Sequence, residues 1–310
     1  MAEWAIWYNL WMMKIFYYDQ HTFPLPEGHR FPVAKYGMLR QRVIAAQVVP
    51  AENLLTPTLV SDVDLQRVHT EDYLHRFANG LLTEAETRRI GLPWSPELVM
   101  RVKYTAGATI AVCRNALADG VSVTLGGGTH HACSDHGQGY CLYNDSVVAA
   151  LVLQAEGLVR RVLVIDCDVH QGNGTAEITA DDPSIFTFSI HGEKNFPFRK
   201  IPGDLDVGLA DGTGDEAYLD VLEGALASAL AQSRPDLAIY LAGADVHEND
   251  RLGRLALTQS GIGRRDSLVL SMCREAGIPV GVTMAGGYGR NLSVMVDIQL
   301  QTVQIVASFA

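Results

Sequence analysis

The sequence has no excess of basic residues: 24 Lys and Arg stand against 35 Asp and Glu, which gives a formal net charge of −11. Nucleic acids and anionic membrane surfaces attract cationic proteins, so this balance argues against both as main partners. It leaves basic substrates open, such as lysine side chains or polyamines. The five cysteines are odd in number and include no CxxC pair, so a reduced, cytoplasmic chain is the simplest interpretation.

The sequence also lacks a convincing targeting segment. Residues 1–13 are apolar, but they carry no basic start and no small-residue cleavage site, which a signal peptide needs. The run is too short for a transmembrane helix and contains Glu3 and Asn9. We therefore predict a folded domain at residues 14–310 and set residues 1–13 apart as an N-terminal extension.

No internal repeat, low-complexity tract or linker divides the rest of the chain. Apolar patterns predict strands at residues 14–19, 121–126, 161–166, 185–191, 237–241 and 279–284, and helices at 36–48, 64–79, 96–119, 146–155, 214–233, 264–276 and 291–308. This alternation predicts one α/β domain with a mostly parallel central sheet and helices on both faces.

One apolar run, residues 162–165, is typical of a buried parallel strand and ends in Asp166, Asp168 and His170. In an extended chain alternate residues lie on one face, so two carboxylates and an imidazole would converge at the carboxyl end of this strand. Sites in open α/β sheets form at that end. Such a group is costly to bury unless a cation pairs with it, although solvated acids and a capping histidine would leave the same pattern.

Asp245 follows the strand predicted at 237–241 and would reach the same edge of a parallel sheet. With Asp168 and His170 it would supply two carboxylates and one imidazole. That donor set leaves a position open for water on Zn²⁺, as catalytic zinc sites require. The sequence therefore predicts a metal site on these three residues.

Two adjacent histidines end the glycine cluster Gly126-Gly-Gly-Thr-His130-His131. Adjacent histidines at a strand end can serve as metal ligands, as acid/base groups, or simply as hydrogen-bonded loop residues. If Asp168, His170 and Asp245 bind the metal, the two histidines are free for proton transfer. Their partners would be Asp166 and Asn173, which would fix the tautomer and orientation of each ring.

Two tyrosines that follow glycines are further candidates, Tyr140 before the helix predicted at 146–155 and Tyr288 after the last predicted strand. Gly139 and Tyr140 would line a narrow substrate passage, or Tyr140 would pack in the ordinary way. Tyr288, between Gly287 and Gly289, would donate its phenol to a developing oxyanion, or would pack on the surface of a turn.

Six segments resemble, in order and spacing, the histone deacetylase superfamily of zinc-dependent acyl-lysine amidohydrolases: GGGTHHA, GYCLYND, DCDVHQGNGT, FSIH, AGAD and GGY. The resemblance extends over roughly residues 17–291. It implies a single-domain arginase/deacetylase fold whose catalytic domain covers residues 14–310. It also implies hydrolytic removal of acyl groups, acetyl or longer, from lysine side-chain amides of proteins or peptides.

The resemblance carries roles for individual residues as well. It implies one zinc ion per chain on Asp168, His170 and Asp245, an acid/base pair of His130 and His131, and Tyr288 as the group that polarises the carbonyl. It implies a structural monovalent cation, usually potassium, at Asp166, Asp168, His170, Ser189 and the carbonyl of Ile190.

Some details are more similar to the class IV deacetylases and their bacterial relatives than to class I. Asn173 stands where class I enzymes carry Asp, and a neutral partner raises the pKa of His131 less than an Asp would. The segments at residues 211–216 and 249–254 point the same way. Which histidine is the general base stays open at this point.

Three other functions share features with this pattern. The first is an amidohydrolase acting on small acylated amines such as acetylpolyamines, but relatives of that kind narrow the pocket mouth with insertions, and no long insertion is present. The second is a two-manganese arginase-type hydrolase, which needs further acidic ligands after the histidine. The third is a silent acyl-lysine binding module, which the intact ligands, histidines and Tyr288 argue against.

Overall fold

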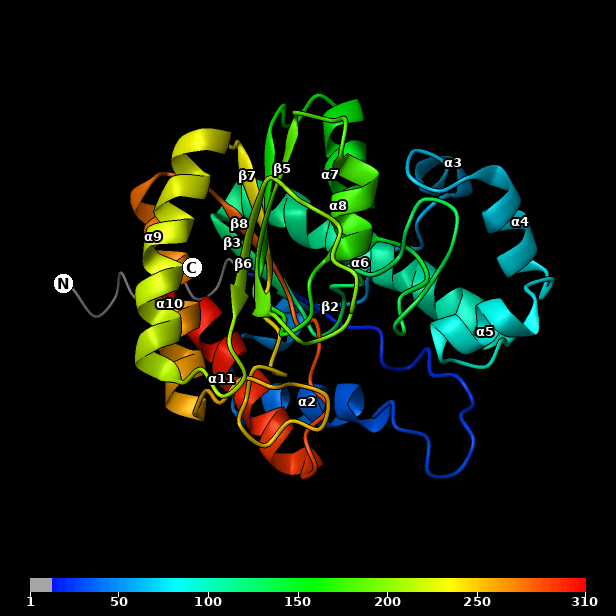
Figure 1. Ribbon diagram of the computed structural model, residues 1–310, viewed down its shortest axis with the longest axis horizontal. Helices are drawn as coiled ribbons and strands as arrows, with labels where there is room; N and C mark the ends of the chain where they lie inside the picture. The colour runs from blue at the N-terminus through cyan, green and yellow to red at the C-terminus, as the bar shows by residue number, and fades with distance from the viewer. Residues whose placement is uncertain (1–12) are drawn as a thin grey trace.

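The computed structural model describes residues 13–310, so the predicted N-terminal extension lies outside it except for Met13. Eight strands form one sheet in the order β2-β1-β3-β8-β7-β4-β5-β6, and every neighbouring pair is parallel (Figure 1). The strands are β1 (Ile15–Phe16), β2 (Leu54–Leu55), β3 (Val121–Thr124), β4 (Val162–Asp166), β5 (Ile185–Gly192), β6 (Leu205–Leu209), β7 (Leu237–Leu241) and β8 (Val280–Thr283). The predicted parallel sheet is confirmed.

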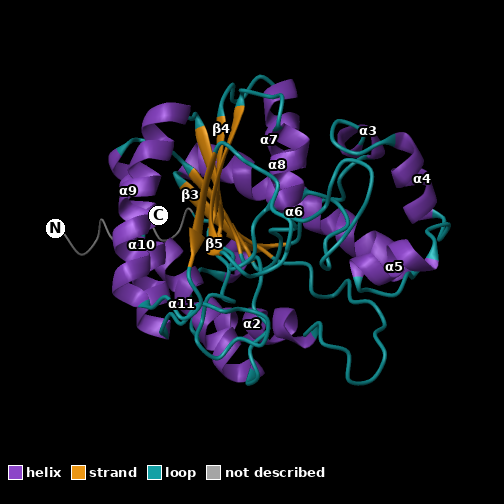
Figure 2. Ribbon diagram, viewed as in Figure 1, coloured by secondary structure: helices purple, strands orange, loops and turns teal. Residues whose placement is uncertain are grey.

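Helices cover both faces of this sheet, which Figure 2 shows nearly edge-on. They are α2 (Ala34–Ala45), α3 (Asp62–Leu65), α4 (Glu71–Ala78), α5 (Glu84–Ile90), α6 (Pro96–Asp119), α7 (Asp145–Ala155), α8 (Asn173–Thr179), α9 (Asp215–Ser233), α10 (Gln259–Glu275) and α11 (Leu292–Ser308), with a 3-10 turn at Ala51–Asn53. Helices α9, α10 and α11 lie on one side, and α6, α7 and α8 lie on the other.

Strand β4 explains why both faces are covered. Its alternate residues Leu163 and Ile165 join the core under α9 to α11, while Val162 and Val164 join the core under α6 and α7. All four are buried. Fully burying one such side chain contributes about 1.5–3 kcal/mol, so a strand that is apolar on both faces is stable only between two layers of helices.

The helix predicted at residues 64–79 is wrong, because the chain breaks into α3 and α4 around His69. His69 is 2% exposed, its Nδ1 lies 3.0 Å from the carbonyl oxygen of Cys133, and the backbone N–H of Asn144 donates to its Nε2 at 3.0 Å. Thr70 then caps α4 by accepting a hydrogen bond from Tyr73 N–H. These contacts with distant segments outweigh the local helical pattern.

Several short elements were not predicted from the sequence. Strand β6 is an edge strand whose first four residues alternate between half-buried and exposed, and β2 has only two residues. Helix α8 begins at Asn173 inside a glycine-containing segment, where glycines weaken a helical pattern. Helix α5 carries a capping box at Thr83 and Glu86, a signal that the sequence contains.

The carboxyl ends of β3, β4, β7 and β8 share one edge of the sheet, as parallel strands require. Strand β8 lies between β3 and β7, and β7 lies between β8 and β4. The four polar or glycine-rich segments that follow these strands are therefore neighbours in space.

Candidate active site

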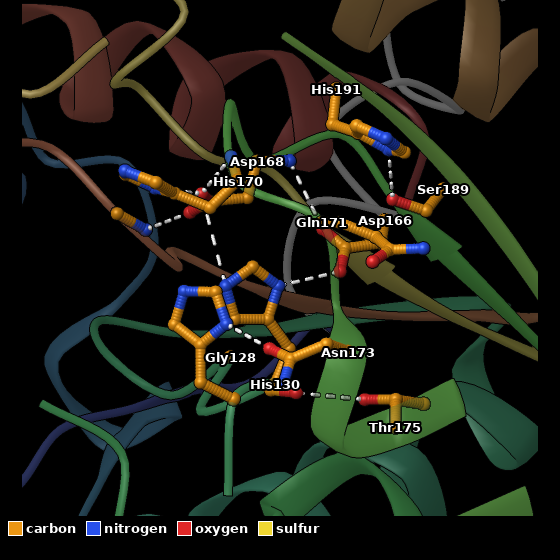
Figure 3. Close-up of polar contacts among 12 residues, drawn as sticks. Gly128, His130, Asp166, Asp168, His170, Gln171, Asn173, Thr175, Ser189 and His191 are labelled. Carbon is orange, nitrogen blue, oxygen red and sulfur yellow. Dashed lines mark hydrogen bonds and ion pairs between the residues drawn. The ribbon is translucent and has the colours of Figure 1, made fainter. Parts of the chain in front are cut away.

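Three candidate metal ligands meet at this edge of the sheet. Asp168 and His170 follow β4, Asp245 follows β7, and all three are buried. Their ligand atoms lie within 4.8 Å of one another. In Figure 3 the side chains of Asp168 and His170 lie together, with His170 Nδ1 2.9 Å from Asp168 Oδ1. The structure thus brings together the trio that the sequence predicted.

The charge balance of the trio fits a bound cation. Asp245 Oδ2 is buried without a hydrogen bond among the described residues; His170 Nδ1 lies 3.3 Å away, outside hydrogen-bond geometry. Burial and the charge of Asp168 raise the pKa of Asp245 to about 7. Burial lowers the pKa of His170, but the adjoining carboxylates outweigh burial and raise it to about 10. A divalent ion would neutralise the carboxylates and leave Nδ1 free as a ligand.

Backbone groups fix both carboxylates in place. The N–H of Gly286 donates to Asp168 Oδ2 at 2.7 Å, and the N–H of Val169 donates to Asp245 Oδ1 at 3.0 Å. A Cβ at position 286 would collide with Asp245 Oδ2 and with Asp168 Oδ2. Only glycine therefore lets the chain after β8 approach the carboxylates this closely.

A buried arginine ties the two ligand-bearing strand ends together. Arg265 on α10 is fully buried and donates to the carbonyl of Cys167 at 3.2 Å and to the carbonyl of Gly243 at 2.6 Å. Its charge is balanced by Asp266, 2.8 Å away. Cys167 precedes Asp168 in the chain, and Gly243 lies two residues before Asp245. Sequence reasoning missed Arg265, because its partners are backbone carbonyls far along the chain.

The histidine pair lies beside the trio, and each ring has the predicted partner. His130 Nδ1 lies 2.6 Å from Asp166 Oδ2, as Figure 3 shows, and His131 Nδ1 lies 2.8 Å from Asn173 Oδ1. Both Nδ1 atoms face acceptors, so the Nε2 atom of each ring remains available for proton transfer. The Nε2 of His130 lies 3.8 Å from Asp168 Oδ1, so the pair adjoins the candidate metal ligands.

The surroundings of the two histidines move their pKa values in opposite directions. Burial lowers the pKa of His130, but the charges of Asp166 and Asp168 outweigh burial and raise it to about 9. Burial lowers the pKa of His131 well below its usual value, and the neighbouring His130 and His170 lower it further. Groups whose pKa values are pushed apart in this way are suited to opposite acid and base roles.

Tyr288 is half-buried and follows β8 on the segment that also supplies Gly286. Burial raises the pKa of Tyr288 well above its usual value, and the charges of Asp168 and Asp245 add to this effect. Its phenol therefore stays protonated as a donor. The buried Lys35 donates to the carbonyl of Gly287 at 3.3 Å and lies 5.4 Å from the Tyr288 ring centroid.

A passage leads from the surface to the histidines, and the predicted Gly139 and Tyr140 line it. The rings of Tyr140 and Tyr288 lie 5.8 Å apart, and Phe196 lies 4.9 Å from the His131 ring. Tyr140 has φ 67°, which is rare for a non-glycine residue, and its N–H donates to Ile90 O at 2.7 Å. Phe196 was missed, because an aromatic residue in a loop has no distinctive sequence signal.

Of the residues suggested for a monovalent cation, Asp168 and His170 belong to the trio, and the other three lie on the neighbouring strands β4 and β5. Asp166 pairs with His130, Ser189 Oγ lies 3.0 Å from His191 Nδ1, and Ile190 is fully buried. No contact among the described residues supports potassium in particular, so the monovalent cation stays a prediction.

The fold and the site define a class of α/β protein in which candidate metal ligands and a histidine pair lie at the carboxyl edge of one parallel sheet. Residues 29–303 match the histone deacetylase domain family. An uncharacterized protein of Picosynechococcus is 44% identical to this chain, over 91% of this chain and 94% of the length of that protein. Histone deacetylase 2 of Arabidopsis thaliana is 28% identical, over 87% of this chain and 72% of the length of that protein. The chain therefore belongs to the histone deacetylase family.

A further relative matches most of the chain, and two solved structures share its fold. The acetoin utilization protein AcuC of Staphylococcus xylosus is 26% identical over 85% of this chain and 74% of its own. The crystal structure of a histone deacetylase homologue from Aquifex aeolicus superposes with a TM-score of 0.83 at 20% identity, over 95% of this chain and 84% of that one. A homologue crystallised with SAHA gives 0.82 at 21% identity, over the same shares of the two chains. The predicted arginase/deacetylase fold is confirmed.

Among the described residues, no helix combines the length and the apolar character that a membrane crossing requires.

Proposed function

We propose that this chain is a zinc-dependent deacylase that hydrolyses acyl-lysine amides in proteins or peptides. The observation that carries the proposal is the juxtaposition of the Asp168, His170 and Asp245 trio with two histidines whose pKa values lie far apart. Amide hydrolysis needs a polarised carbonyl, a base for water and an acid for the leaving amine. The residues supply one group for each task.

Asp168, His170 and Asp245 would hold the zinc ion. When bound, the ion supplies Lewis acidity, which polarises a carbonyl and lowers the pKa of water to about 7. Tyr288 would donate a hydrogen bond from its phenol to the carbonyl oxygen as negative charge develops there, because its raised pKa keeps the phenol protonated. This hydrogen bond stabilises the charge on the oxygen.

His131 takes the proton of the attacking water at Nε2, since its lowered pKa keeps it neutral and Asn173 orients the ring. His130 carries a proton beside Asp166 and adds positive charge next to the reacting amide. The protonated pair then returns one proton to the departing amine, and the products are a carboxylate and a free lysine.

The shape of the pocket supports a short acyl group. The chamber lined by the two histidines, Asp168 and His170 has a volume of about 70 Å³, and the mouth outside it has a volume of about 590 Å³. The acyl end would enter the chamber, while the rest of the substrate would occupy the mouth. An acetyl group fits this arrangement with less rearrangement than a long chain.

A substrate panel tests the proposal. Lysine peptides that carry acetyl to myristoyl groups are incubated with purified protein beside acetylpolyamines, and free amine is measured. We expect turnover of acyl-lysine peptides, fastest for acetyl. Turnover restricted to acetylpolyamines would replace the proposal by the small-amine alternative, and no turnover with zinc bound would leave a binding module.

A further inference from the structure

The mouth of the passage carries the opposite charge sign from the whole chain. Sixteen described residues line it, and five of them are cationic: Arg88, Arg89, Lys194, Arg251 and Arg254. No Asp or Glu is among the sixteen, although the chain as a whole has a formal net charge of −11. Such a concentration of one sign in a cavity focuses the electric field on whatever enters it.

Three of these five charges have no carboxylate partner among the described residues. Arg89 and Lys194 are exposed and form no ion pair, and Arg251 donates to two backbone carbonyls, Tyr288 O at 2.9 Å and Arg30 O at 3.3 Å. Carbonyl partners orient a guanidinium but leave its charge uncompensated.

The other two cations are paired only at the surface. Arg88 lies 3.2 Å from Glu84, and both side chains are more than 70% exposed. Arg254 lies 3.1 Å from Asp211, and both of these are exposed as well. Exposed pairs of this kind contribute little energy, so a substrate carboxylate can compete for the same cations.

The nearby carboxylates are turned away from the opening. Glu193 precedes Lys194, but a Cβ at Gly208 on β6 would collide with its carboxylate, so this carboxylate lies against β6. Asp250 is buried and accepts hydrogen bonds from three backbone N–H groups. Beside the cations, Phe198 is 88% exposed, so the mouth also offers an apolar contact.

We propose that this basic mouth selects acyl-lysines that lie in acidic stretches of polypeptide and disfavours cationic substrates such as acetylpolyamines. The inference rests on the proposed function and names its substrate class. A peptide chain on both sides of the acyl-lysine would place neighbouring Asp or Glu side chains near Arg89 and Lys194. Arg251, which donates to Tyr288 O, would then lie beside the lysine stem.

Binding tests this selection independently of catalysis. Two labelled acetyl-lysine peptides are compared, one flanked by Asp and Glu and one by Lys and Arg, together with N-acetylspermidine as a competitor. Affinity is measured by fluorescence anisotropy on the zinc-loaded Tyr288→Phe protein, which we expect to turn substrate over slowly. The acidic peptide should bind about tenfold more tightly than the basic one at low salt. This preference should shrink at about 1 M salt, where the screening length falls to about 3 Å.

Charge-reversal variants locate the effect. Arg89→Glu with Lys194→Glu should invert the preference. Arg160→Glu is the matched control, because Arg160 is exposed and precedes β4 at the opposite edge of the sheet. It should keep the wild-type preference.

Each remaining outcome decides one of the two proposals. Equal binding of the two peptides, tighter binding of the basic peptide or N-acetylspermidine, or loss of the preference in Arg160→Glu would overturn the selection by the mouth. If wild-type protein still hydrolyses a peptide in that case, the deacylase function stands. A preference for the acidic peptide without any hydrolysis by wild-type protein would keep the mouth assignment and overturn the deacylase function.

Discussion

The backbone N–H of Tyr288 donates to Asp250 Oδ2 at 2.6 Å. The same carboxylate accepts from Leu252 N–H at 2.8 Å and Gly253 N–H at 3.0 Å through Oδ1. Arg251, the residue after Asp250, donates to Tyr288 O at 2.9 Å. The loop at residues 249–254 therefore fixes the backbone on both sides of the phenol, although no residue of that loop is part of the metal trio or the histidine pair.

Asp250→Ala should lower kcat by about 10- to 100-fold with a smaller change in KM, because displacing a reacting group by about 1 Å can cost about 100-fold. The metal content should not change. Steady-state kinetics on an acetyl-lysine peptide measure the effect. Asp211→Asn is the control. Asp211 is exposed and pairs with Arg254, the last residue of the 249–254 loop, at a distance from the Tyr288 backbone contacts. Equal losses in the two variants would argue against a positioning role for Asp250.

Tyr288→Phe should lower kcat by about 10²–10³, the usual cost of removing one oxyanion donor. The substitution keeps the ring and deletes only the hydroxyl, so KM, metal content and thermal stability should change little. Stopped assays over a range of peptide concentrations separate kcat from KM. A variant with near-normal kcat would remove Tyr288 from the chemistry.

His131→Ala should lower kcat by at least about 100-fold while the metal stays bound, as expected for a general acid–base group. Kinetics combined with metal analysis of the same preparation test this. Loss of the ion instead would reverse the assignment of ligands and bases.

The partner of His131 offers a matched variant. Asn173→Asp places a negative charge 2.8 Å from Nδ1 and should raise the pKa of His131 above that of the wild type. A base with a higher pKa is deprotonated only at higher pH, so the acidic limb of the kcat/KM profile should move upward. An unchanged limb would mean that another group titrates there.

Purified protein should contain about one divalent ion per chain, with zinc the expected one. A chelator should abolish activity and lower the thermal midpoint, because ligands that bind only the folded state stabilise it by about 2.7 kcal/mol at 100 times Kd. Asp245→Ala should likewise abolish activity and lower the thermal midpoint without a chelator. A requirement for two manganese ions would contradict the deacylase function.

His69 should make stability depend on pH. Burial lowers its pKa from 6.5 to about 4, so the folded state holds the ring neutral while the unfolded chain protonates it below about pH 6.5. Stability is therefore complete above pH 6.5 and lost as the pH falls toward 4, by about 3 kcal/mol at most. Urea unfolding at several pH values should show a flatter dependence for His69→Phe. His75→Gln, an exposed histidine on α4, should retain the wild-type dependence.

The sequence predicted the core of the site well for a physical reason. Asp166 ends the buried strand β4, Asp168 and His170 follow it, and the other motifs follow strands of the same parallel sheet, so strand direction brings them to one edge. The groups that hold this core were missed. Arg265 and Asp250 act on backbone atoms of distant segments, which leave no periodic pattern in the sequence.

The same limit applies to the fold and to the mouth. The break at His69 comes from hydrogen bonds with segments more than 60 residues away, which no local propensity encodes. The cations of the mouth come from segments around residues 89, 194 and 251, and only the folded chain brings them into one opening. The net charge of the whole chain, which can be counted from the sequence, is negative, whereas the mouth is positive.

The position of β8 has a consequence for how the protein is made. Among the described strands it is synthesised last, yet it is the only link between β3 and β7 within the sheet. Until residues 280–283 have left the ribosome, the nascent chain carries two half-sheets whose inner edges are unpaired. Tyr288 emerges later still. The enzyme should therefore gain both its closed sheet and its activity only near the end of translation, and until then those edges would be open to chaperones or to aggregation.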